Sequence, residues 1–71
     1  MFLYKVEAEM KDGSLLTVVV AAANDEQAFR GAENQLWQYT VAKPAVNRWS
    51  LVEKKPLRPG AGYVIRTVPD V

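Results

Sequence analysis

The chain has 71 residues, of which 49% are hydrophobic, and it carries a net charge of +1 with no cysteine and no histidine. A chain of this length forms one domain, whose core supplies roughly 3–5 kcal/mol of net stability. The lack of cysteine excludes disulfides and thiolate metal sites, and the lack of histidine removes the commonest general base. We therefore expect a single α+β domain over residues 1–71 that binds no metal and no cofactor.

Charge is distributed unevenly along the chain. Residues 1–42 carry three basic and six acidic side chains, a balance of −3. Residues 43–71 carry six basic and two acidic side chains, a balance of +4. The two halves are opposite in sign, which predicts an electrically polar molecule.

No targeting segment is evident at the start of the sequence. The first residues have neither the basic region nor the continuous apolar region of a secretory signal. The longest apolar stretch, residues 18–23, is far shorter than the roughly 20 residues that span a bilayer. With no cysteine as well, these observations predict a cytoplasmic protein without membrane contact.

The first half of the chain begins with a predicted hairpin. Residues 2–10 alternate between apolar and polar side chains, which indicates a half-buried strand. Asp12-Gly13 is a strong hairpin signal, and residues 15–23 follow as a second, more evenly apolar strand.

The register of this hairpin follows from the face that must be buried. A three-residue loop with Gly13 in the left-handed conformation is expected to place Met10 opposite Leu16 and Val6 opposite Val20. This choice gathers the apolar even-numbered residues of both strands on one face, whereas a two-residue loop would mix apolar and polar residues.

An amphipathic helix is predicted over residues 25–42. Asn24 is a good N-cap, and Gln27 three residues later resembles a capping box. Pro44 ends the segment, because the residue before a proline avoids helical geometry. At 100° per residue, the stripe expected to face the core consists of Ala28, Phe29, Ala32, Leu36, Tyr39 and Thr40.

Two further strands are predicted, over residues 46–54 and 62–68, separated by a loop with two prolines and a glycine. With regular alternation, Trp49 and Leu51 share one face of the third strand with Glu53. Two hairpins joined by one helix predict the order ββαββ. The expected fold is a four-stranded, mainly antiparallel sheet with the helix packed on one face.

No residues form a convincing catalytic constellation. Glu7 and Glu9 share a face of the first strand, but that face is otherwise polar, so a solvated surface explains them best. Ser14 and Ser50 have no histidine to activate them, and neither has a lysine at a recognised spacing. We therefore expect a protein that is not an enzyme.

The loop over residues 54–63 combines cations and glycines ahead of an aromatic residue. Such groups can contact phosphates or single-stranded nucleic acid, although the spacing of a P-loop is absent. A solvated loop whose lysines discourage aggregation and a protein-contact loop are the other two interpretations. The residues that would contact an anion or nucleic acid are Arg48, Lys54, Lys55, Arg58 and Arg66.

The remaining candidate sites suggest contact with a protein. Trp37 lies at the border of the helical stripe, where it is either an interface anchor or part of the peripheral core. The sheet face away from the helix is apolar along the second strand, at Leu15, Thr17 and Val19. The sequence therefore predicts an interaction module that binds another protein or itself, as a homodimer, through the outer sheet face, a sheet edge or Trp37. The alternative is nucleic-acid or phosphate-ligand binding through the basic C-terminal half.

Four phrases of the sequence resemble a known family. They are residues 1–5, the run 18–22 that leads into an acidic helix start, and residues 51–55 followed by 60–64. Together they resemble a family of short uncharacterised proteins, classed as a domain of unknown function, from spore-forming Gram-positive bacteria. The resemblance implies a bacterial cytoplasmic protein, and it implies no activity and no functional residues.

Overall fold

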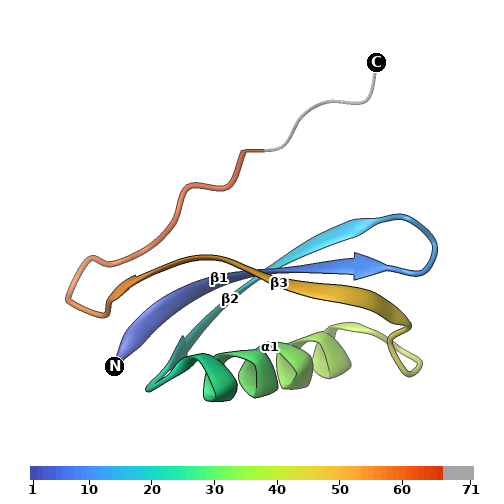
Figure 1. Ribbon diagram of the computed structural model, residues 1–71, viewed down its shortest axis with the longest axis horizontal. Coiled ribbons are helices and arrows are strands. Elements are labelled where there is room, and N and C mark those ends of the chain that lie inside the picture. Colours follow the sequence, from blue (N-terminus) through green and yellow to red (C-terminus); the bar gives the residue numbers. More distant parts are fainter. Residues whose placement is uncertain (67–71) are drawn as a thin grey trace.

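The computed structural model describes residues 1–66 of the chain. Its elements in chain order are β1 (Phe2–Met10), β2 (Leu15–Ala22), α1 (Asp25–Tyr39) and β3 (Val46–Pro56). The strands form one antiparallel sheet in the order β2-β1-β3, and α1 lies across one face of it (Figure 1). Over these described residues the fold is α+β, with one helix and a three-stranded sheet.

The predicted four-stranded ββαββ sheet is wrong, because the sheet has three strands. Of the predicted fourth strand, residues 62–66 contain no strand, and residues 67–68 lie outside the described residues. Val64 and Ile65 are consecutive apolar residues and are exposed by 92% and 47%, so this segment offers no buried face to a sheet. After β3 the chain turns at Gly60 and runs along the side of the sheet away from α1 (Figure 1).

The first hairpin has the expected loop but not the expected pairs. Met10 N donates to Ser14 O at 2.8 Å, and Gly13 has a φ of 90°, as a three-residue loop with a left-handed glycine requires. Val6 therefore lies opposite Val18, two residues away from the expected partner. An offset of two keeps every side chain on its expected face, because the period of a strand is two.

The third strand pairs with β1 and not with a fourth strand. Its register shifts twice along β1, which marks β-bulges or similar irregularities. Trp49 and Leu51 pack against the core, on the helix side of the sheet. Glu53 was expected on that side but lies opposite Lys5 on the other, because one shift reverses the alternation.

The core lies between the sheet and α1 and is small. Its buried residues are Tyr4, Val6, Ala8, Ala22, Ala28, Ala32 and Leu36. The helix packs mainly on β2 and to a smaller extent on β1. It ends at Tyr39 rather than residue 42, because Thr40 adopts an extended conformation and caps Leu36 O with its backbone N–H.

Candidate functional site

The two outer strands of the sheet differ in how their free edges are protected. A free edge exposes unpaired backbone groups, and proteins usually protect it with charges, prolines or bulges. Strand β3 has these protections: register shifts, a terminal Pro56, and charged side chains from Arg48 to Lys55. Strand β2 has no charged residue and no proline over Leu15–Ala22, and its pairing with β1 is continuous. The side of β2 that faces away from β1, here called the β2 edge, is therefore the unprotected side of the sheet.

The β2 edge presents backbone donors and acceptors at alternate residues. Ladder hydrogen bonds alternate along an antiparallel pair, and Met10 N donates to Ser14 O. Even-numbered residues of β2 therefore direct their backbone groups to β1. The residues whose N–H and C=O groups point outward are Leu15, Thr17, Val19 and Ala21.

The side chains of these odd-numbered residues lie on the sheet face opposite α1. Leu15 is 62% exposed and Val19 is 40% exposed, with Thr17 between them. These three residues were predicted as a partner site, and the structure brings them together in one row next to the β2 edge.

The helix flank above the β2 edge is also uncharged. Gln35 lines a hollow of about 390 Å³ between α1 and β2, together with Val18 and the 75% exposed Tyr39. By helical periodicity the same flank carries Gln27, Gly31, Asn34, Gln35 and Gln38. Among residues 1–66, those that form the β2 edge, its outer row and this flank are all uncharged.

Trp37 lies on the opposite flank of the helix. It is 47% exposed and lines a second hollow, of about 180 Å³, with Trp49 of β3. Charged residues accompany it there, since Glu33 and Lys43 line the same hollow. The structure therefore does not join Trp37 to Leu15, Thr17 and Val19 in one surface.

The five predicted anion-contact residues do not converge either. Arg48 lies near one end of β3 and pairs with Glu9 at 3.2 Å. Lys54 lies near the other end and pairs with Asp25 at 3.3 Å. Lys54 follows Arg48 by six positions along the strand, which is roughly 20 Å at the usual rise per residue. Arg58 and Arg66 follow in the segment after β3.

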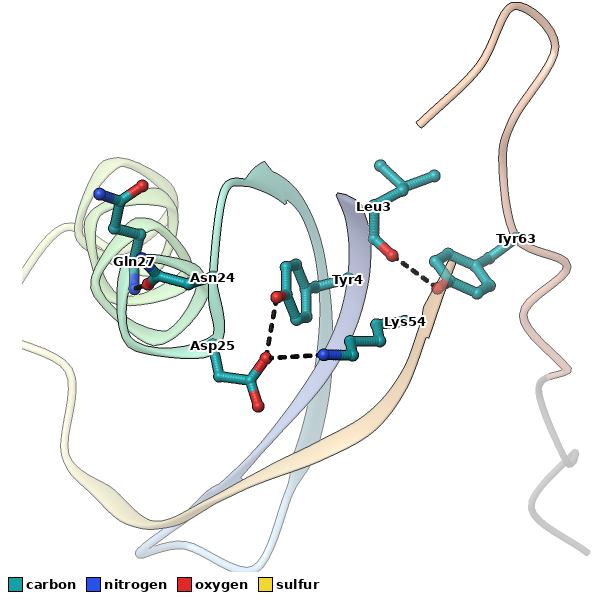
Figure 2. A network of polar contacts seen from close by, with 7 residues as sticks. All are labelled: Leu3, Tyr4, Asn24, Asp25, Gln27, Lys54 and Tyr63. Carbon is teal, nitrogen blue, oxygen red and sulfur yellow. Dashed lines mark hydrogen bonds and ion pairs between the residues drawn. The ribbon is translucent and has the colours of Figure 1, made fainter. Parts of the chain in front are cut away.

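A polar network joins the start of the helix to the sheet (Figure 2). Tyr4 donates its hydroxyl hydrogen to Asp25 Oδ1 at 2.8 Å, and Lys54 Nζ donates to the same oxygen at 3.3 Å. The Tyr4 hydrogen bond, followed by that of Lys54, lowers the pKa of Asp25. Burial, followed by the bond to Asp25, raises the pKa of Tyr4. The network anchors the first turn of α1, and its groups are mutually satisfied.

A second contact in Figure 2 attaches the segment after β3 to the central strand. The Tyr63 hydroxyl donates to Leu3 O at 2.7 Å, and Lys55 Nζ lies 4.2 Å from the centre of the Tyr63 ring. Lys55 therefore makes a cation–π contact inside the molecule. Two cations of the predicted loop, Lys54 and Lys55, therefore lie in β3 and support the fold.

Residues 1–66 contain neither a metal-binding cluster nor a membrane-spanning helix. No three acidic side chains there lie close enough together to hold a metal ion. No helix of this part of the chain is long and apolar enough to cross a membrane.

The residues that the sequence did not predict for this site are Val18, Gln35 and Tyr39. Helical periodicity places Tyr39 in the core stripe, but the helix ends there and its side chain remains outside. The signal available in the sequence was the absence of charge from residues 14 to 24 together with four uncharged polar residues on one helix flank. That signal becomes specific only when β2 is known to be an edge strand.

Comparison with known protein families gives a match over most of the chain. A family model described as "Protein of unknown function (DUF3906)" matches residues 1–65. Neither a search of curated proteins nor a search of solved structures finds a significant match.

Proposed function

The chain belongs to this family of proteins of unknown function, and we propose that it is a non-enzymatic interaction module whose β2 edge accepts a strand from a protein partner. The observation that carries the proposal is the contrast between the two edges of the sheet. The β3 edge has charges, register shifts and a proline, and the β2 edge has none of these over eight residues. Edges without such protection pair readily with another strand.

The chemistry of strand addition fits the surroundings of the β2 edge. Backbone groups of alternate residues provide affinity, and adjacent side chains provide specificity. Here the exposed Leu15 and Val19 would contact the partner's side chains on one face of the extended sheet. On the other face, the hollow beside Gln35 and Tyr39 would receive apolar groups.

Affinity capture with an edge-blocked variant tests the proposal. Thr17→Pro removes an outward N–H, and proline is tolerated where that N–H faces solvent. We expect the tagged chain to capture a specific protein from extracts of its source organism, and that protein can be an untagged copy of the chain itself. The Thr17→Pro variant should no longer capture it. Val52→Lys, on the β3 edge, is the control and should retain the captured protein. Equal capture by all three proteins would contradict the proposal.

Nucleic-acid or phosphate binding through the basic half is the weaker candidate. Arg48 and Lys54 each have a carboxylate partner, and Lys55 contacts the Tyr63 ring. An anion would have to compete with these contacts. Titration of labelled single-stranded DNA or RNA at low salt tests this candidate, because phosphate contacts produce binding that weakens steeply with salt.

Two narrower proposals accompany the interaction module. The resemblance of residues 1–5, 18–22, 51–55 and 60–64 supports a family restricted to spore-forming Gram-positive bacteria. The absence of cysteine supports a cytoplasmic location. Fluorescence microscopy of the tagged chain in such a cell tests the location.

A further inference from the structure

We propose that the strand accepted by the β2 edge is an uncharged extended segment of a partner protein that inserts one aromatic side chain into the hollow between α1 and β2. This inference rests on the proposed function and names the class of partner that the same site selects. The anchoring residue lies opposite Val18, on the helix side of the enlarged sheet. Three features support this partner: the position of α1, the place of the hollow along β2, and the chemistry of its lining.

The helix is not centred on the three-stranded sheet. It packs mainly on β2, an outer strand, and less on the central β1, and Gly31 lies against Val20 of β2. A helix with its side chains is about 10–12 Å wide, and neighbouring strands lie about 4.8 Å apart, so one helix covers about two strands. Part of the width of α1 therefore extends beyond β2, over the place where an added strand would lie. The helix side of that strand would be covered by α1 as soon as the strand paired.

The space under α1 changes along β2. Beside Val20 the helix is so close that a Cβ added at Gly31 would come within 2.9 Å of Val20 Cγ2. The hollow of about 390 Å³ lies further along the helix, and its lining consists of residues 16–19 of β2 with Gln35, Leu36 and Tyr39 of α1. A bulky side chain of an added strand therefore has room near Val18, and not beside Val20, where helix and strand are in contact.

Strand periodicity determines which partner residue reaches the hollow. Odd-numbered residues of β2 direct their backbone groups outward, so Thr17 and Val19 would bond the added strand. The side chain of Val18 packs toward the core and lines the hollow. Residues directly opposite one another share a sheet face, so the partner residue opposite Val18 also points to α1, whichever way the strand runs. In an antiparallel strand this residue and Val18 form a non-hydrogen-bonded pair, in which side chains approach most closely.

The lining of the hollow favours an aromatic anchor. The residues among 1–66 that line it are all uncharged, so a charged side chain placed there would lose water without gaining an ion partner. Val18 and Leu36 supply apolar contacts, and the ring of Tyr39 can pair edge to face with another ring. A volume of about 390 Å³ suits the largest side chains, and aromatic residues bury about 150–250 Å² each.

The partner strand as a whole is expected to be uncharged. Residues 14 to 24 carry no charge, and the helix flank above them presents uncharged amide side chains at Gln27, Asn34, Gln35 and Gln38. A charged side chain on the helix side of the added strand would be buried under α1 with no ion partner. Lys11 and Asp12 of the hairpin loop and Asp25 of the helix start lie beyond the two ends of β2 and limit this uncharged stretch.

Selection from a displayed library of random linear peptides tests the inference on the full-length chain. Peptides are retained that bind the immobilised wild-type chain but not the Thr17→Pro variant, so only binders that depend on the β2 edge are sequenced. We expect these peptides to contain an uncharged extended stretch with one shared aromatic residue. In a synthetic peptide, replacing this residue by alanine should raise the dissociation constant about ten- to hundredfold, and replacing it by lysine should raise it at least as much.

Filling the hollow should remove the preference for an aromatic residue. Gln35→Trp places a large side chain at the hollow from an exposed helix position. In this variant the aromatic and alanine forms of the peptide should bind with dissociation constants within about threefold of each other. Gln38→Trp is the matched control, because it makes the same substitution on the same exposed flank but outside the lining of the hollow, and it should keep the wild-type difference. Circular dichroism identifies a variant that has failed to fold, and Gln35→Phe then replaces Gln35→Trp.

Edge-dependent peptides that share no aromatic residue, or whose preference for it survives Gln35→Trp, would overturn the inference and leave the proposed strand acceptor standing. A wild-type dimer that Thr17→Pro dissociates in sedimentation velocity would also overturn it, because β2 of a second copy carries no aromatic residue. A library without any peptide that depends on Thr17 would overturn it as well, and the affinity capture would then decide separately whether the β2 edge binds a protein.

Discussion

Gly31 of α1 lies directly against Val20 of β2, so closely that a Cβ added at Gly31 would come within 2.9 Å of Val20 Cγ2. Real Cβ atoms do not approach another carbon this closely, and the valine side chain has few other rotamers available. The helix can therefore lie this near to β2 only because position 31 has no side chain.

Gly31→Ala is accordingly expected to destabilise the protein despite the better helix propensity of alanine. Overpacking costs about 1–3 kcal/mol, and replacing a glycine inside a helix returns about 1 kcal/mol. We expect the free energy of unfolding to fall by about 1 kcal/mol, measured by urea denaturation. Asn34→Ala, at an exposed position of the same helix, is the control and should not destabilise. A Gly31→Ala variant more stable than wild type would show that the strand and helix separate without cost.

A double-mutant cycle identifies the contact responsible. Val20→Ala removes the methyl groups that obstruct position 31, so the two substitutions should compensate in part. We expect the double variant to be more stable than the sum of the single effects predicts by at least about 0.5 kcal/mol. Strict additivity would place the cause of the Gly31→Ala effect elsewhere.

Asn24 caps the helix, and its side chain accepts a hydrogen bond from Gln27 N at 2.9 Å (Figure 2). Asn24→Ala leaves this backbone donor without its partner and should lower the free energy of unfolding by about 1 kcal/mol. Asn24→Ser retains an acceptor and should recover most of the loss. Equal destabilisation by serine and alanine would indicate that the side chain acts in some other way.

The cap was predicted from the sequence, and the structure confirms it, because capping depends on residues that are close in the chain. The loop at Gly13 could be predicted for the same reason. The pairing of β3 could not, since the register shift that places Glu53 opposite Lys5 lies in the pairing with β1, far away in sequence. The prediction of a fourth strand was wrong because Val64 and Ile65 have the composition of a strand without its alternation of apolar and polar residues.

The candidate site likewise combines features that the sequence predicts with features that depend on contacts distant in sequence. The row of Leu15, Thr17 and Val19 on the sheet face away from α1 follows from strand periodicity alone, and the structure places all three together. Its importance depends on strand order, because the same row on a central strand would have no free edge. The surroundings of Trp37 could not be predicted in this way, since its border position on the helix gave no indication of which flank faces β3.

Asp25 makes folding stability depend on pH in the acid range. Hydrogen bonds from Tyr4 and Lys54 hold the pKa of Asp25 below its ordinary value of 3.8. A lowered pKa stabilises the fold above the unfolded value, and this contribution is lost as the pH falls through the folded value. Asp25→Asn should therefore have a lower free energy of unfolding than wild type at pH 7. The difference between the two free energies should narrow below pH 3.8.

Chemical denaturation at several pH values measures this gap. Asp12, whose pKa is lowered by hydrogen bonds from Ser14, titrates in the same range and contributes to the loss in both proteins. Asp12→Asn is therefore a suitable control. The difference in free energy of unfolding between wild type and Asp12→Asn should also narrow at low pH, although this variant keeps the hydrogen bond from Tyr4 to Asp25. A gap between wild type and Asp25→Asn that stays constant from pH 7 to below pH 3.8 would exclude the charge of Asp25 as its cause.

Tyr63 holds the segment after β3 against the sheet by two separable contacts. Tyr63→Phe removes the hydroxyl that bonds Leu3 O but keeps the ring beside Lys55, and Tyr63→Leu removes both. Loosening this segment should expose the end of β3, where Leu57 N donates to Met1 O at 3.1 Å. We expect the Leu57 amide to exchange about five- to tenfold faster in Tyr63→Leu, with Tyr63→Phe intermediate, as measured by NMR. Val64→Ala, at a fully exposed neighbour, should leave exchange unchanged. If Leu57 exchanged at the wild-type rate in Tyr63→Leu, the hydrogen bond to Met1 would be holding the end of β3 without help from the segment that follows.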